Sequence, residues 1–249
     1  MTKIDDYRKK LNSLESWISF LMRESGLPGP RGNLELAEAV ADVGNQERFE
    51  HLLSLDNAKA TTNSPEGYLV FCGVAGMGKL IAEGKVKYWD KLRPYASDPR
   101  WRIREAVAIA LQRVGDADMD NLLSKMEIWK AGNWLEKRAV AAALAEPRLL
   151  KKPEVAIQVL QIFDKITIDM ENAKDPKSEE FKILRQGMGY CWSIAVAALP
   201  KDGKQAMEKW LKSENPEIRW IMRENLKKNR LVKMDAEWVK DCVVMLESF

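Results

Sequence analysis

Histidine is nearly absent from the sequence, and this absence excludes several kinds of catalytic site. His51 is the only histidine. A zinc site with two histidine ligands is therefore impossible, and a Ser-His-Asp or Cys-His centre would have to use this single residue. His51 lies in the segment FEHLLSL, beside apolar residues at helical spacing. That setting favours an ordinary side chain on a helix surface over a catalytic one.

The sequence also has little cysteine, no long apolar run and no large excess of one charge. The three cysteines are far apart, and no segment reaches the ~18 consecutive apolar residues of a membrane span. The N-terminal residues MTKIDDYRKK contain no apolar signal core. With 40 basic and 37 acidic residues, the net charge of +3 does not by itself imply nucleic acid or membrane binding. We expect a cytoplasmic protein that does not enter a membrane.

Internal repetition is the main positive feature of the sequence. The segment DPRWRIREAVAIAL recurs 33 residues later as GNWLEKRAVAAAL, and two more diverged copies follow. Each copy comes after a shorter amphipathic segment, so the repeating unit is predicted to be helix, turn, helix. The four copies cover residues 98–111, 132–144, 192–199 and 215–226.

The apolar positions of the first copy predict a helix with neighbours on more than one side. Further apolar residues make its apolar stripe wider than packing against a single neighbouring helix requires. Strand signals are weak throughout, because β-branched runs are short and no Asn-Gly or Asp-Gly turn joins two alternating segments. The sequence therefore predicts an all-α protein of stacked helix pairs. The stripe comprises Ile103, Val107, Ala110 and Val114, widened by Ala106, Ile109 and Leu111.

The pattern D-P-x-x-x-I-R-E-A-V-A-I-A-L resembles the second helix of HEAT repeats. In that resemblance Asp98 caps the helix, Pro99 fits its first turn and Arg104 matches the usual arginine. It implies one domain, 1–249, folded as a right-handed α-α superhelix (a HEAT-like solenoid) of roughly five helix pairs with capping helices. An insertion and Glu136, where an aliphatic residue is expected, depart from the pattern. The implied segments are a cap at 1–30, repeats at 45–229, the insertion at 169–180 and a second cap at 236–249.

Two segments imitate ligand-binding motifs. Gly73–Lys79 (GVAGMGK) fits the phosphate-binding loop G-x-x-x-x-G-K, but Leu80 stands where Ser or Thr would bind magnesium. A helix whose glycines permit close packing is the favoured interpretation.

Four acids have the spacing of a calcium loop, yet apolar residues between them indicate that a helix has already begun. We expect no cofactor and no metal. The four acids are Asp116, Asp118, Asp120 and Glu127.

Basic residues and tryptophans at repeated positions are the candidate partner-binding residues. In the last copy, four basic residues recur on one helical face within an otherwise strongly basic segment, 219–233. Basic and tryptophan residues also hold equivalent positions in the first two copies, and equivalent positions of a solenoid line one surface. The competing interpretations are that the basic residues form an ordinary solvated helix face and that the tryptophans fill space between packed helices. The candidates are Arg104, Lys137, Arg219, Arg223, Lys227, Arg230, Trp101 and Trp134.

The leading functional hypothesis is a non-enzymatic module that binds an acidic protein segment or nucleic acid along its inner helices. No small-molecule substrate and no catalytic residue can be identified. The alternative is a resemblance to the HEAT-like DNA alkylation repair proteins, which implies a DNA glycosylase with a basic groove, a tryptophan-lined pocket and a carboxylate. Glu105 and Asp164 are candidate acids, but neither lies in a recognisable motif. A carboxylate in a groove beside an exposed tryptophan would distinguish the two hypotheses.

Overall fold

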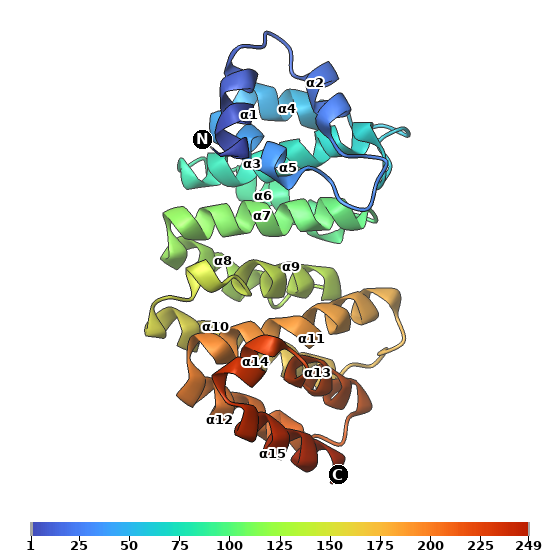
Figure 1. The fold of residues 1–249 in the computed structure, drawn as a ribbon. Coiled ribbons are helices and arrows are strands. Elements are labelled where there is room, and N and C mark those ends of the chain that lie inside the picture. The colour runs from blue at the N-terminus through green and yellow to red at the C-terminus, as the bar shows by residue number, and fades with distance from the viewer. Residues whose placement is uncertain (1, 249) are drawn as a thin grey trace. The chain divides into compact units, whose positions relative to one another are not determined.

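The computed structural model describes residues 2–248, and all of its regular structure is helical (Figure 1). No strand occurs among these residues, which confirms the predicted all-α class. The predicted caps contain α1 and α2 at one end and α15 at the other; their outermost residues, 1 and 249, lie outside the described part. The predicted single domain divides into two compact units, Met1–Asp118 and Met119–Phe249.

The first unit is organised around α5, its longest helix. Because α5 packs against α2, α3, α4, α6 and α7, nearly its whole circumference is buried. A short 3₁₀ turn, Arg93–Ser97, leads from α6 into α7. The predicted stripe of α7 is buried except for the partly exposed Ile109, and the Val107 side chain is fully enclosed. The helices are α1 (Lys3–Asn12), α2 (Ile18–Glu24), α3 (Leu34–Val43), α4 (Gln46–Ser54), α5 (Pro65–Ala82), α6 (Tyr88–Leu92) and α7 (Trp101–Ala117).

The segment that imitates a phosphate loop lies within α5, as the favoured interpretation predicted. A Cβ atom on Gly76 would lie 2.3 Å from the Phe49 ring of α4, and one on Gly78 would lie 2.3 Å from the Ala110 carbonyl oxygen of α7. Lys79 Nζ donates to the carbonyl oxygens of Asp42 and Gly44, at 2.8 Å each. The glycines therefore allow close helix contact, and the lysine satisfies carbonyl groups at the end of α3.

In the second unit, α9, α11 and α13 pack in chain order. Helix α11 contacts α9 and α13. Helix α10 packs against all three of these helices, and α12 packs against α11 and α13. The buried Asn225 side chain of α13 accepts from the Ser193 backbone N–H and donates to the Met188 carbonyl of α11, both at 2.8 Å. The helices are α8 (Met119–Trp129), α9 (Trp134–Leu144), α10 (Pro153–Glu171), α11 (Glu179–Ala198), α12 (Pro200–Leu211), α13 (Pro216–Leu226), α14 (Asn229–Met234) and α15 (Ala236–Glu247).

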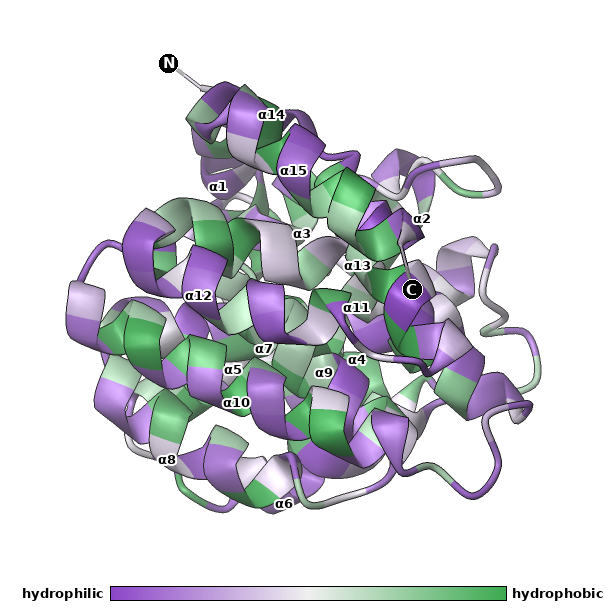
Figure 2. Ribbon diagram, turned by 90° about the horizontal axis from the view of Figure 1, so that it is seen from below, coloured by the Kyte–Doolittle hydropathy of each residue, from purple (hydrophilic) through white to green (hydrophobic). Residues whose placement is uncertain are grey.

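Hydrophobic and hydrophilic residues share the circumference of most helices (Figure 2). This pattern is expected where one face is buried and the other meets water. None of the described helices combines the length and apolarity that crossing a membrane requires.

Two helix starts differ from what the resemblance implies. Asp98 does not cap α7, which begins at Trp101 without a side-chain cap. The Asp98 carboxylate instead accepts hydrogen bonds from the backbone N–H and the guanidinium group of Arg100. Glu136 belongs to a capping box at the start of α9, where it accepts from the Asn133 backbone N–H at 3.0 Å. A carboxylate suits that position because it satisfies a backbone donor at the helix start.

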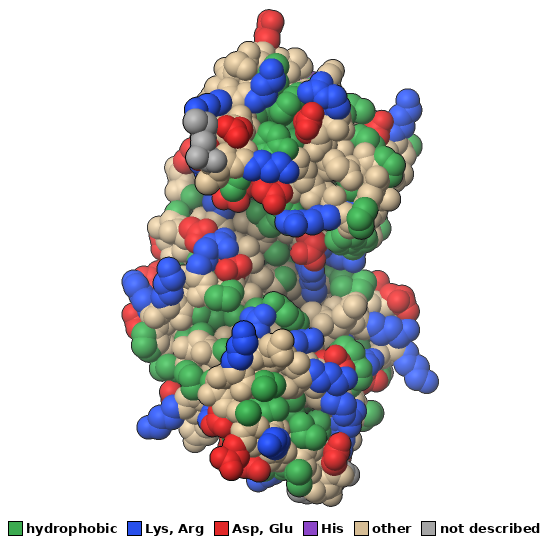
Figure 3. Space-filling model, in the orientation of Figure 1, with side chains coloured by type: hydrophobic (Ala, Val, Ile, Leu, Met, Phe, Trp, Pro, Cys, Tyr) green, Lys and Arg blue, Asp and Glu red, His purple; other side chains and the backbone are tan. Residues whose placement is uncertain are grey.

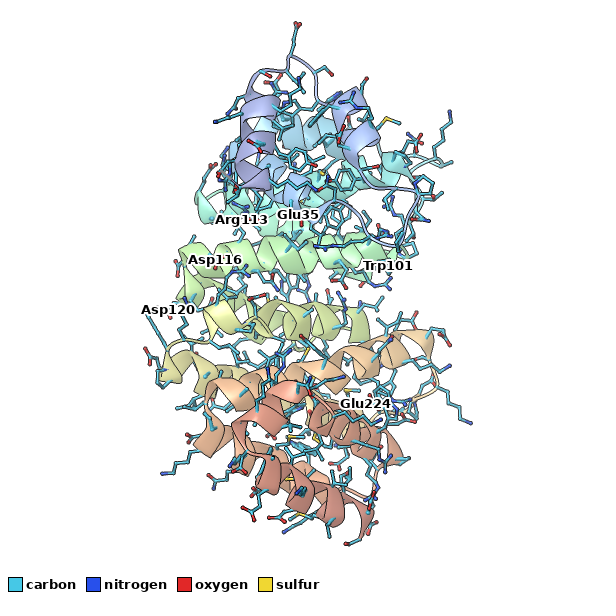
Figure 4. The ribbon with its side chains drawn as sticks, in the orientation of Figure 1. Glu35, Trp101, Arg113, Asp116, Asp120 and Glu224 are labelled. Carbon is cyan, nitrogen blue, oxygen red and sulfur yellow. The ribbon has the colours of Figure 1, made fainter. Side chains whose placement is uncertain are left out.

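The acids with calcium-loop spacing lie across the end of α7 and along α8. Figure 4 shows Asp116 at the end of α7 and Asp120 at the start of α8. Glu127 forms an ion pair with Lys130, one turn further along the chain. Within residues 2–248, no cluster of three or more His, Cys, Asp or Glu side chains could hold a metal ion.

Candidate functional site

A groove of about 430 Å³ runs between α11 and α13 in the second unit. Basic side chains gather on this part of the surface (Figure 3), and Figure 4 labels Glu224 on α13. The groove combines cationic, aromatic and acidic side chains, with one glycine in its wall. Its lining residues are Lys182, Arg185, Gln186, Gly189, Tyr190, Trp220, Glu224 and Lys228.

Helical periodicity places the α11 residues of the groove. Lys182, Gln186 and Tyr190 are four residues apart and exposed, while the opposite face of α11 is buried. Gly189 makes room for α13, because a Cβ at this position would lie 3.0 Å from the Trp220 ring and 3.2 Å from Glu224 Cβ. Helix α13 therefore approaches α11 closely enough to form one wall of the groove.

Cations lie over both aromatic rings. The Arg185 guanidinium is 4.0 Å from the Trp220 ring centroid, and it also forms a 2.8 Å ion pair with Glu217. At Tyr190, the Arg230 guanidinium is 4.7 Å from the ring centroid and donates to the hydroxyl group. Such contacts hold the long basic side chains in place while leaving their charge near the surface.

Glu224 supplies a carboxylate within this cationic setting. Its Oε1 accepts from Lys227 Nζ at 2.5 Å. This hydrogen bond, followed by the attraction of neighbouring positive charges, lowers the pKa of Glu224 below its usual value. Glu224 is therefore ionised at neutral pH, and it lies in a groove that a partly exposed tryptophan, Trp220, also lines.

None of the four basic residues predicted in and after the last copy lines the groove, but three of them lie beside it. Arg223 is exposed on α13, Lys227 is exposed directly after it, and Arg230 reaches Tyr190 from α14. The prediction that all four share one face of a single helix is therefore wrong, because α13 ends at Leu226. Arg219 is different, because its guanidinium donates to the Leu246 carbonyl of α15. That contact ties α13 to the C-terminal helix.

The cations predicted in the first two copies are buried, so we correct their assignment to a partner-binding surface. Arg104 is 7% exposed, and its guanidinium donates to the carbonyls of Asp98 and Pro99 at 2.6 and 3.1 Å. Lys137 is 5% exposed, and its Nζ donates to the carbonyls of Lys130 and Gly132 at 2.6 and 2.9 Å. Each side chain folds back on the loop before its own helix and donates to carbonyl oxygens there, and Lys137 Nζ also forms an ion pair with Asp169 of α10 at 3.2 Å.

The two predicted tryptophans also have different surroundings. Trp101 is 48% exposed at the start of α7, where the Arg102 guanidinium lies 4.3 Å from its ring centroid. Trp134 is partly buried and meets the Phe181 ring edge-on, with centroids 5.4 Å apart. Trp101 therefore remains an exposed candidate in the first unit, whereas Trp134 contributes to packing in the second.

The candidate acids named from the sequence have other surroundings. Asp164 lines a groove of about 420 Å³ between α10 and α12, where it accepts from the indole N–H of Trp210 at 2.9 Å and pairs with Lys209 at 2.5 Å. Trp210 is only 4% exposed, so this groove offers no open tryptophan face. Glu105 lies on α7 and is partly buried. Glu224, which sequence reasoning did not select, comes closer to the criterion of a carboxylate beside an exposed tryptophan, because Trp220 is partly exposed, although the Arg185 guanidinium lies over its ring.

Sequence reasoning missed the α11 side of the groove. The spacing of Lys182, Gln186 and Tyr190 was the available signal, but these residues lie 29 to 37 residues before the start of the basic segment at Arg219. No family model matches this chain, and no match is found among curated proteins or solved structures.

Proposed function

We propose that this chain is a non-enzymatic, HEAT-like α-solenoid module that binds nucleic acid through the groove between α11 and α13. The observation that carries the proposal is the alternation of cations and aromatic rings on two neighbouring helices. The consecutive packing of α9, α11 and α13 supports the solenoid architecture.

Nucleic acid fits this groove better than an acidic protein segment does. Both ligands would attract Lys and Arg side chains, so charge alone does not separate them. Tyr190 and Trp220 add flat apolar surfaces, on which bases stack and acidic side chains do not. Arginine guanidinium groups bind phosphates in a forked geometry and can also stack on bases.

Salt-dependent binding tests the proposal. Fluorescence anisotropy with labelled DNA should detect binding at low salt, with affinity falling linearly against log salt concentration by a slope of about −0.9 per phosphate on a duplex. The double substitution Arg223→Ala/Lys227→Ala should weaken binding to all sequences and reduce that slope by about two units. Both side chains are exposed, so stability should barely change.

A matched control removes two exposed charges elsewhere in the same unit. Lys151 and Lys152 precede α10 and do not line the groove. Lys151→Ala/Lys152→Ala should keep the native slope. Absence of binding to DNA or RNA at low salt would refute the proposal. Equal competition by polyglutamate of matched charge would instead indicate an acidic protein partner.

Glu224 and Trp220 support a second candidate, a DNA glycosylase of the alkylation repair type. A carboxylate beside an accessible tryptophan in a basic groove is the feature by which we distinguish this hypothesis. Incubation with alkylated DNA should then release damaged bases, and Glu224→Gln should abolish release while retaining DNA binding. Glu214→Gln, on an exposed residue before α13, is the control. Failure of the native protein to release any base would exclude this candidate.

A further inference from the structure

Tyr190 presents an aromatic ring to solvent in the middle of a polar helix face. The residue is 45% exposed, although the rest of the exposed face of α11 around the groove is Lys182 and Gln186. Its hydroxyl group accepts from Arg230, and Lys228 Nζ lies 5.7 Å from its ring centroid. An exposed aromatic side chain held by cations on neighbouring segments has the properties of a stacking platform.

Arg185 and Trp220 form a second planar surface in the groove. The guanidinium lies 4.0 Å from the Trp220 ring centroid, and the ring itself lies against α11 at Gly189. Bases of nucleic acids stack on aromatic rings and also on guanidinium planes. Two such surfaces line a groove of about 430 Å³, a volume typical of pockets for small flat ligands.

The position of Glu224 indicates where a bound strand would place its phosphates. An ionised carboxylate within the groove repels phosphate, so the groove interior favours a neutral base. Exposed cations lie close by, with Arg223 on α13 and Lys227 directly after it. The arrangement fits a strand whose backbone follows the exposed cations while a base enters between the aromatic groups.

We infer that the partner of this groove is single-stranded nucleic acid, with one unpaired base stacked on Tyr190 and the Arg185–Trp220 pair as a second stacking surface. This inference rests on the proposed nucleic-acid function. Bases in a duplex are covered above and below by their neighbours, so only unpaired bases can offer a face to these side chains. Recognition of this kind is tolerant of sequence, because every base has a π-face.

The test compares a labelled single strand of about 12 nucleotides with a duplex of the same length and sequence, at one low salt concentration. The native protein should bind the single strand at least about tenfold more tightly. Tyr190→Ala should weaken single-strand binding by about 5- to 150-fold, the range that follows from losing one stacked base. Tyr190→Phe should bind nearly as the native protein does, because the ring is kept while the hydroxyl is removed.

A control for loss of exposed apolar surface is Ile157→Ala on α10, where the native side chain is 40% exposed. This variant should bind both probes normally. Circular dichroism should show that Tyr190→Ala retains the native helix content, because the replaced side chain lies on the surface.

The outcomes separate this inference from the proposal beneath it. Absence of binding to either probe would overturn both. Equal binding of single strand and duplex with normal salt dependence, unchanged by Tyr190→Ala, would overturn the single-strand inference and leave the nucleic-acid proposal standing. An equal loss in Tyr190→Ala and Tyr190→Phe would also overturn it, because the Arg230 contact, and not stacking, would then be responsible.

Discussion

Gly76 occupies a position in α5 where a side chain has no room. A Cβ atom there would lie 2.3 Å from the ring of Phe49, which is fully buried and enclosed. Replacing a glycine by alanine within a helix ordinarily stabilises it by about 1 kcal/mol. At Gly76 steric overlap should reverse the sign, so we predict that Gly76→Ala lowers the free energy of unfolding by about 1–3 kcal/mol. Urea unfolding monitored by circular dichroism measures this change.

Gly187 of α11 provides the control, since it is also a helical glycine. The nearest atom to a Cβ there is Arg138 Cγ at 3.7 Å, an ordinary contact distance. Gly187→Ala should leave stability unchanged or raise it by up to about 1 kcal/mol. Equal destabilisation by both substitutions would show that crowding is not the reason for the glycines in α5.

At the level of single residues, the sequence predicted a basic segment that borders the groove, but none of the predicted partner-binding residues lines it. Arg230 lies on α14 and not on the predicted single helical face, because α13 ends at Leu226, but Arg223 and Lys227 could be found from helical spacing. Tyr190 could not, because its meeting with Arg230 depends on how α11 and α14 pack. The burial of Arg104 could not be predicted from the sequence either, because a long side chain can either extend into water or turn back to carbonyl groups.

A hydrogen bond between α6 and α4 involves a buried tyrosine, Tyr88, whose ionisation should lower the stability of the protein at high pH. The Tyr88 hydroxyl donates to Glu50 Oε1 at 2.5 Å, and the Tyr88 side chain has no exposed surface. Burial, and secondarily the bond to Glu50, raise the pKa of Tyr88 to about 12, while the same bond lowers the pKa of Glu50. The stabilisation from Tyr88 is complete below its unfolded-state pKa of about 10 and is lost as the pH rises towards 12.

We therefore predict that the native protein loses stability between about pH 10 and 12, and that Tyr88→Phe loses less over the same interval. Other buried tyrosines contribute equally to both proteins, so the difference between the two curves isolates Tyr88. Thermal unfolding at several pH values gives these curves. Parallel curves for the two proteins would contradict the prediction.

Whole helices were easier to predict than their boundaries. The internal repeat identified α7, α9 and α13, and a broad apolar stripe supported α7, since burial on several sides leaves a pattern in the sequence. The predicted insertion at 169–180 includes the last residues of α10 and the first of α11, as well as the loop between them. Local polar residues there form a cap at Ser178, which accepts from the Phe181 backbone N–H. A repeat pattern does not reveal such helix extensions, because they preserve the helical period.

At the scale of the whole molecule, three buried cysteines can report on the two units separately. None forms a disulfide, and all three are buried: Cys72 in the first unit, Cys191 and Cys242 in the second. Burial raises the pKa of both Cys72 and Cys242 to about 12, which suppresses the reactive thiolate at neutral pH. We predict that a thiol reagent labels none of them in the native protein and all of them in denaturant.

Mass spectrometry of the labelled peptides along a urea gradient checks this prediction and assigns each label to a unit. A surface cysteine introduced by Ser124→Cys on α8 serves as the control, since position 124 is exposed and should react without denaturant. Prompt labelling of Cys72 in the native protein would contradict the enclosed position of α5.

The buried cations Arg104 and Lys137 have a consequence for how a chain of this kind could grow. Each binds carbonyl groups of the loop that directly precedes its own helix, within seven residues along the chain. The loop that leads into each helix is thus stabilised by a side chain from that same helix. A copied stretch of about 33 residues would carry both the loop and the side chain that fastens it. Duplication of such a stretch would therefore copy the contact that holds its loop, whereas the ion pair of Lys137 with Asp169 and the packing of neighbouring helices involve residues outside the stretch.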